Sequence, residues 1–207
     1  KTNVIKSIDK KDHKVLDNYF DLLNNNYFNK ISTEALRWQA RLIIDNNNTD
    51  MIIGCRKRFE NLIEVFIKVK NAEGLFLKMA RILEHSGLEV IDANIFTSKD
   101  NAFAANTFIT KYSHHDRPFT KDELKELAQR IKRNFKDFSK ILQIPKKPIK
   151  KVSFEKIINI SHSINKEKNR DMITIETADR PGLLVDIAKV FFKKDMSIFS
   201  SRINTLG

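Results

Sequence analysis

Between positions 63 and 112 the hydrophobic residues follow first the two-residue spacing of a strand and then the spacing of a helix. Over Ile63–Val69 every second residue is apolar, so that Ile63, Val65, Ile67 and Val69 share one face, which predicts a strand. Leu75–Ser86 has the three-to-four-residue spacing of an amphipathic helix. Two more strands are predicted over Leu88–Thr97 and Phe103–Tyr112, with a hairpin turn at residues 98–101 between them.

The next segment predicts a second helix and a closing strand. Thr120 followed by Glu123 forms a capping box, which marks a helix start. The apolar face of this long helix consists of Leu124, Leu127, Ala128, Ile131, Phe135 and Phe138. Pro145 and Pro148 end the helix. The strand expected to close the first sheet carries Val152, Phe154, Ile158 and Ile160. The predicted order is therefore βαββαβ.

Helices are also predicted before the first strand. Residues 8–30 read as one helix, with an apolar stripe formed by Leu16, Phe20, Leu23 and Tyr27. Ser32 is the expected N-cap of a second helix, whose apolar face holds Leu36, Ala40, Ile43 and Ile44. A turn over Asn46–Asp50 and a short strand at Met51–Ile53 complete this N-terminal part.

A similar pattern returns near the C-terminus, over Ile173–Gly207. Ile173 and Ile175 alternate with polar residues, an amphipathic helix is predicted from Leu183, and Met196–Thr205 has the composition of a strand. A shift of 108 positions aligns Gly74–Ser98 with Gly182–Leu206 without a gap. Identical residues recur at Gly74/Gly182, Leu75/Leu183, Ala80/Ala188, Ile95/Ile203 and Thr97/Thr205. The sequence therefore predicts an internal repeat.

The loop before the C-terminal helix, Asp179-Arg180-Pro181-Gly182, combines residues that can start a helix and residues that can contact a ligand. Gly182 allows another molecule to approach the backbone, and Pro181 suits a first helical turn. The free N–H groups at the helix start favour a carboxylate. Asp179 can cap those groups or hold a ligand ammonium, and spacing alone favours capping.

The composition bounds the class of protein. The 207 residues include 38 Lys and Arg against 26 Asp and Glu, a net charge of +12. The basic residues are scattered and no RNP-type strand is found, so a solvated surface is favoured over nucleic-acid binding. The single cysteine excludes an internal disulfide. With no apolar run of about 18 residues and no signal peptide, we expect a cytoplasmic chain without a membrane segment. Lys at position 1 suggests a fragment of a longer protein.

The motif DRPGLL, Asp179–Leu184, followed by a helix and by SRINTLG, Ser201–Gly207, resembles the ACT domain, a ferredoxin-like module that binds amino acids near its first strand–helix loop. Within that family it looks most like the C-terminal ACT pair of the bifunctional uridylyltransferase/uridylyl-removing enzymes that act on the signal protein PII. Tyr27–Ile43 resembles the helical connector before that pair. The family often has His after Trp38, where this chain has Gln39.

The resemblance implies an α+β chain of ferredoxin-like βαββαβ ACT units. Residues 1–50 would be the connector, 51–160 the first unit and 161–207 an incomplete second unit. It also implies glutamine as effector, with PII as the partner of the parent enzyme. The implied ligand residues are Asp179, Arg180, Pro181, Gly182 and Leu183, with Asn71 and Gly74 in the first loop. That first loop departs from the family pattern, because Asn71 replaces Asp and Glu73 replaces Pro.

The parent enzymes carry their chemistry in other domains, which use magnesium to transfer UMP from UTP to PII and a metal hydrolase to remove it. Those metal-binding carboxylates are needed because the metal neutralises phosphate charge. This chain has no Gly-Ser followed by D-x-D, and His114-His115-Asp116 lies in a loop. No catalytic residue, metal site or resident cofactor is therefore expected here. Two alternatives stay open: an ACT region of another amino-acid or stringent-response enzyme, and a basic RNA-binding module.

An incomplete second unit would leave apolar strand faces exposed. Residues 171–207 are therefore expected to join the first sheet or to form an intermolecular sheet, so self-association is possible. Val65, Phe66, Ile91 and Ile95 would offer the surface. For the same reason, a complete glutamine pocket is not expected in this segment alone.

Overall fold

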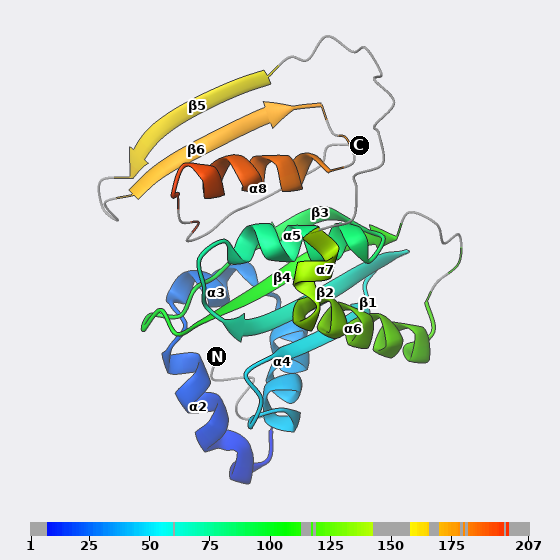
Figure 1. Ribbon diagram of the computed structural model, residues 1–207. Helices are drawn as coiled ribbons and strands as arrows, with labels where there is room; N and C mark the ends of the chain where they lie inside the picture. The colour runs from blue at the N-terminus through cyan, green and yellow to red at the C-terminus, as the bar shows by residue number, and fades with distance from the viewer. Residues whose placement is uncertain are drawn as a thin grey trace. The chain divides into compact units, whose positions relative to one another are not determined.

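The computed structural model describes residues 8–59, 61–112, 117, 119–142, 158–165, 170–178, 180, 182–196 and 198. Its elements are η1 (Lys10–Asp12), α2 (His13–Asp21), α3 (Asn25–Lys30), α4 (Thr33–Asp45), β1 (Ile52–Lys57), β2 (Leu62–Lys70), α5 (Leu75–His85), β3 (Leu88–Asn94), β4 (Phe103–Tyr112), α6 (Lys121–Lys136), α7 (Phe138–Leu142), β5 (Ile158–Asn165), β6 (Arg170–Thr177) and α8 (Leu183–Lys193) (Figure 1). The chain forms two compact units, and β5 and β6 belong to the second.

The larger unit contains a four-stranded antiparallel sheet in the order β1-β2-β4-β3. At its centre Phe66 of β2 lies opposite Gly54 of β1 and Thr107 of β4. The sheet and the alternation of strands with helices are compatible with ferredoxin-like units. The α+β prediction is confirmed.

Helices α5, α6 and α7 cover one face of this sheet (Figure 1). The apolar stripes of α5 and α6 enter the core as predicted, with Met79, Ile82, Leu127 and Ile131 at most 2 % exposed. The capping box of α6 is confirmed: Glu123 N donates to Thr120 Oγ1 at 3.3 Å, and Thr120 N donates to Glu123 Oε2 at 2.8 Å. Such a cap contributes about 1 kcal/mol to stability.

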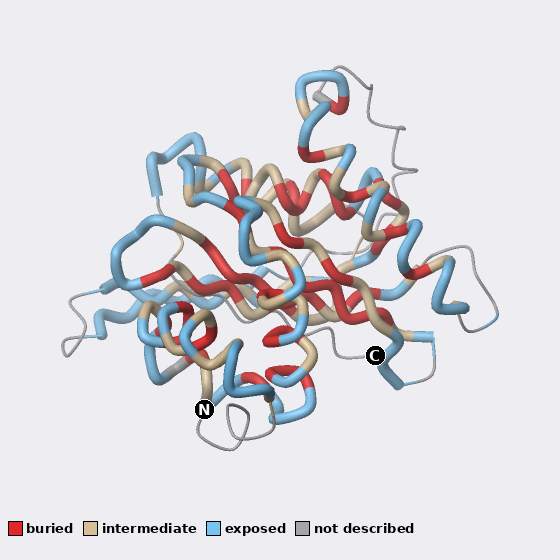
Figure 2. The backbone as a smooth tube through the Cα atoms, turned by 90° about the horizontal axis from the view of Figure 1, so that it is seen from below, coloured by how far each residue is buried: buried red, intermediate tan, exposed pale blue. Residues whose placement is uncertain are grey.

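The N-terminal helices cover the opposite face of the sheet (Figure 1). Phe66, Phe96 and Ala105 project from the strands into a second core filled by these helices. Figure 2 shows the buried positions running along the strands and along the inner sides of the helices. The expected free β surface is therefore wrong for Val65, Phe66 and Ile95, which are buried; Ile91 is half-buried.

The single helix expected over residues 8–30 is divided into η1, α2 and α3. The division before α3 occurs at Asn24, whose side chain accepts a hydrogen bond from Tyr27 N at 3.1 Å. Because Asn competes for backbone groups, it favours a new N-cap over a continuous helix. The N-cap predicted at Ser32 is confirmed, since its hydroxyl accepts from Ala35 N at 3.2 Å.

The prediction of the closing strand is wrong. The edge of the sheet beside β2 is occupied by β1, which extends the short strand expected at Met51–Ile53. Ile158 and Ile160 lie in β5, which pairs with β6 instead; Val152 and Phe154 lie outside the described residues. Local closure explains the choice, because closing the short connection between β1 and β2 loses less entropy than pairing β2 with a strand far along the chain.

In the smaller unit, β5 and β6 form an antiparallel hairpin from Ile158 opposite Thr177 to Asn165 opposite Arg170. When 108 is added to their residue numbers, β1, β2 and α5 fall on 160–165, 170–178 and 183–193. These ranges coincide closely with β5, β6 and α8 in turn. The predicted internal repeat is confirmed, and it begins one strand earlier than expected. The strand at Ile173–Glu176 does not join the first sheet of this chain.

None of the helices in the described part of the chain has the length and hydrophobicity required to cross a bilayer.

Candidate functional site

The two loops predicted to bind ligand each contain a glycine with a left-handed backbone conformation. Loop 1 comprises residues 71–74 between β2 and α5, and loop 2 comprises residues 178–182 between β6 and α8. Gly74 has φ 67° and Gly182 has φ 77°, both in the left-handed region that side chains disfavour. Glycine is therefore required in each loop by the backbone itself.

A matching hydrogen bond closes each loop. Leu75 N donates to Ala72 O at 3.2 Å in loop 1, and Leu183 N donates to Arg180 O at 3.1 Å in loop 2. The two acceptors are again separated by the offset of 108. The repeat therefore extends from sequence to the turn geometry, and each loop leads into the positive end of a helix.

Loop 2 is described at three of its predicted ligand residues. Arg180, Gly182 and Leu183 are half-buried, and Leu183 is the first residue of α8. Asp179 and Pro181 lie outside the described residues. The roles assigned to all five residues stay predictions.

Loop 1 is joined to the turn between β3 and β4. Asn71 N donates to Ala102 O at 2.9 Å. The side-chain amide of Asn71 donates from Nδ2 to Asn101 Oδ1 at 2.8 Å. Asn71 therefore has at least a structural role in loop 1. Its sequence context did not indicate Asn101 as its partner.

Gly74 of loop 1 also lies against an aromatic ring from the second repeat. A Cβ atom built on Gly74 would lie 2.8 Å from Cε2 of Phe192, in α8. That separation is shorter than van der Waals contact, so a side chain at position 74 would have to displace the ring. Phe192 and Gly74 both belong to the larger unit, which includes residues 184–207, so the space beside Gly74 is already occupied within that unit.

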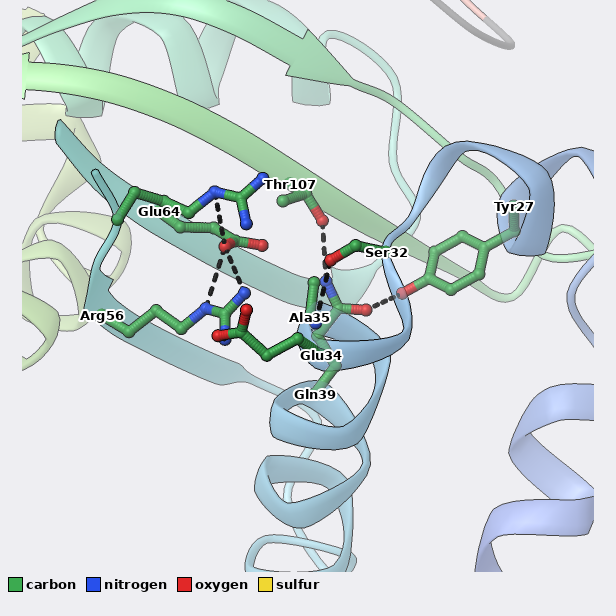
Figure 3. A network of polar contacts seen from close by, with 9 residues as sticks. Tyr27, Ser32, Glu34, Ala35, Gln39, Arg56, Glu64 and Thr107 are labelled. Carbon is green, nitrogen blue, oxygen red and sulfur yellow. Dashed lines mark hydrogen bonds and ion pairs between the residues drawn. The ribbon is translucent and has the colours of Figure 1, made fainter. Parts of the chain in front are cut away.

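A buried polar network holds α4 to the sheet (Figure 3). Gln39 of α4 is 0 % exposed; its Nε2 donates to Thr107 Oγ1 at 3.0 Å, and its Oε1 accepts from the Tyr27 hydroxyl. Burial is the main cause that raises the pKa of Tyr27 well above its usual value. The sequence analysis assigned no role to Gln39. The one sign of its burial in the sequence is that a polar residue lies within the apolar face of a helix.

A second clamp is centred on Arg56 of β1, also drawn in Figure 3. Its Nε and Nη2 donate to Glu64 Oε2 at 2.9 and 2.7 Å, and its Nη1 donates to Glu34 Oε1 at 2.8 Å. The guanidinium lies over the Trp38 ring, 4.9 Å from its centroid. Since Glu34 and Trp38 belong to α4, the clamp fixes this helix across the sheet. The interpretation of Trp38 as a packing anchor agrees with this geometry.

The described residues contain no cluster of three or more His, Cys, Asp or Glu side chains that could hold a metal ion. His114, His115 and Asp116 lie outside them. Cys55 is a free cysteine that packs against the core between the sheet and helices α5, α6 and α7. Burial raises the pKa of its thiol to about 12.

We predict that the Cys55 thiol reacts slowly in the folded protein. Because the thiolate is the nucleophile, alkylation by iodoacetamide at pH 8 should be at least about a hundredfold slower in buffer than in urea. Because the pKa is raised in the folded state, the contribution of Cys55 to folding stability is fully present below the ordinary thiol pKa of 9.0. This contribution is lost as the pH rises from 9.0 toward 12. Mass spectrometry of quenched samples measures the rates, and equal rates in both states would contradict the prediction.

Comparison with known proteins identifies relatives over nearly the whole chain. The chain is 24 % identical over 200 residues to the bifunctional uridylyltransferase/uridylyl-removing enzyme of Psychrobacter sp. (strain PRwf-1), covering 91 % of this chain and 22 % of that protein. It is 26 % identical over 199 residues to the enzyme of the same name from Acinetobacter baylyi, covering 89 % and 21 %. The chain thus spans about a fifth of the length of these relatives. This is consistent with a match to their C-terminal region and confirms the resemblance found from the sequence.

No family model matches the chain. No solved structure matches it either.

Proposed function

We propose that this chain is the glutamine-sensing regulatory region of a bifunctional uridylyltransferase/uridylyl-removing enzyme. The observation that carries the proposal is the alignment, which runs through about nine-tenths of this chain but about a fifth of each relative. A region of that size, whose sequence shows no Gly-Ser followed by D-x-D, is suited to regulation. The repeated glycine loops support an amino acid as the ligand.

Loop 2 is the proposed glutamine site. The carboxylate of the ligand would meet the free N–H groups and the positive end of α8, and Gly182 would let it approach the backbone. The ligand ammonium would be held by Asp179. Loop 1 is the weaker candidate, because Asn71 is bonded to Asn101 and Gly74 lies against Phe192.

Glutamine would act by shifting a population between two arrangements of the catalytic domains. Low glutamine would favour magnesium-dependent transfer of UMP from UTP to PII, and high glutamine would favour its removal. The effect requires glutamine to bind the two arrangements with different affinities. By the same linkage, PII binding that favours one arrangement would change the affinity for glutamine.

We predict that glutamine binding depends on loop 2 more than on loop 1. In the full-length protein, Gly182→Val should weaken binding at least about tenfold, because a branched side chain there strains a left-handed residue and blocks the ligand. Asp179→Asn, which keeps the side-chain size, should also weaken it through loss of charge. Asn71→Ala should change it by less than about threefold. Calorimetric titration measures the affinities.

A titration in which Asn71→Ala has the larger effect would reverse the ranking of the loops. Binding of a different amino acid in place of glutamine would support the alternative, an ACT region of another enzyme. An assay of UMP transfer to PII with and without glutamine then tests whether the binding is regulatory.

A further inference from the structure

The turn between β3 and β4, residues 98–102, contacts two segments that are far apart in sequence. One is loop 1, and the other is the C-terminal end of α2. All three segments belong to the larger unit. The turn is therefore placed to connect a candidate ligand loop with the N-terminal helices.

The turn is held by its own hydrogen bonds. Ser98 Oγ and Asp100 Oδ1 lie 2.6 Å apart, and Ala102 N donates to the same oxygen at 3.1 Å. Ser98 Oγ accepts from Phe103 N at 3.0 Å. Asn101 has φ 61°, a left-handed conformation that Asn tolerates better than most residues. These internal bonds and the backbone of Asn101 together fix the conformation of the turn.

Two bonds join the turn to α2. Lys99 N donates to Leu22 O at 2.8 Å, and Lys99 Nζ donates to Asp21 O at 2.8 Å. The last carbonyls of a helix have no partner within the helix, so both contacts satisfy groups that α2 leaves open. The ammonium also suits the negative end of the helix.

Two more bonds join the turn to loop 1, those from Asn71 N to Ala102 O and from Asn71 Nδ2 to Asn101 Oδ1. Together the contacts form a continuous hydrogen-bonded path from loop 1 through the turn to α2. We propose that this turn couples the conformation of loop 1 to the C-terminal end of α2. The proposal does not depend on glutamine or on any catalytic activity.

Hydrogen exchange measured by NMR tests the coupling in the full chain. Asn71→Ala and Asn101→Gly each remove the side-chain bond, and glycine keeps the left-handed backbone of position 101. The amides of Leu22 and Leu23, which close the end of α2, should exchange about three- to tenfold faster in both variants, the range expected for loss of one hydrogen bond. Glu73→Ala, an exposed substitution in the same loop, is the matched control and should leave these amides unchanged.

Coupling is reciprocal, so a change on the α2 side should reach loop 1. Lys99→Met, which removes the bond to Asp21 O, should speed exchange of the Asn71 amide. Faster exchange confined to residues 70–75 and 98–103, with Leu22 and Leu23 unaffected, would overturn the proposal. So would an equal acceleration of the α6 amides, because that result indicates global destabilisation rather than a path.

Discussion

Replacing Arg56 with Met is expected to destabilise the fold by about 3–5 kcal/mol, the range for breaking a buried ion pair on one side. Arg56 donates twice to Glu64 Oε2, and the side chain of Glu64 is 2 % exposed. Met fills much of the same volume beside Trp38 but, among the described residues, leaves this carboxylate paired with Arg58 through a longer contact of 3.6 Å. The free energy of unfolding in urea measures the loss.

A second substitution shows where the loss comes from. Adding Glu64→Gln to the Arg56→Met variant removes the uncompensated charge, so the double variant should recover a large part of the lost stability. Lys57→Met, at the exposed neighbour of Arg56, is the control and should change stability by less than about 0.5 kcal/mol. A double variant no more stable than Arg56→Met would contradict a role for the buried charge.

The elements of the first repeat could be predicted because their signals are local. Alternation over Ile63–Val69 and the capping box at Thr120 each depend on residues within a few positions of one another, and both agree with the structure. The two loop glycines were also found, because a glycine between a strand and a helix is visible in the chain. Their left-handed backbones give that pattern its physical reason.

Pairing between distant strands could not be predicted in the same way. Two short apolar runs, at Ile52 and at Ile158, fit the edge beside β2 equally well by periodicity. Periodicity reports which face of a strand is buried and not which strand lies next to it. For the same reason the packing of α2–α4 on the sheet was not predicted. The apolar stripe of a helix shows which side of the helix is buried but not which face of the sheet it packs against.

The structural partners of the candidate site were missed for a related reason. Asn71 pairs with an asparagine 30 positions away, and Gln39 pairs with Thr107, 68 positions away. A single sequence shows that such residues are polar but not whether they meet each other or solvent. Sequence reasoning therefore gave Gln39 no role and gave Asn71 a role in ligand binding, and it found neither of these two contacts.

Replacing Gln39 with Leu is expected to destabilise the fold by about 2–5 kcal/mol. The substitution fills the space with an apolar side chain, but it removes the hydrogen bonds that the hydroxyls of Tyr27 and Thr107 make with Gln39. Each buried hydroxyl left unsatisfied costs about 1–3 kcal/mol. Arg41→Leu, on the exposed face of the same helix, controls for the change in helix composition and should alter stability by less than about 0.5 kcal/mol.

The source of this loss of stability can be tested by also removing the hydroxyls of Tyr27 and Thr107. Adding Tyr27→Phe and Thr107→Val to Gln39→Leu replaces Gln39 and both of its hydroxyl partners with apolar groups of similar shape, which can be nearly neutral. The triple variant should therefore be more stable than Gln39→Leu alone, although it carries two more substitutions. If urea unfolding instead shows losses that add up across the three sites, the network does not act as a unit. In that case α4 is held to the sheet by its apolar contacts and by Arg56, and Gln39 only fills space between them.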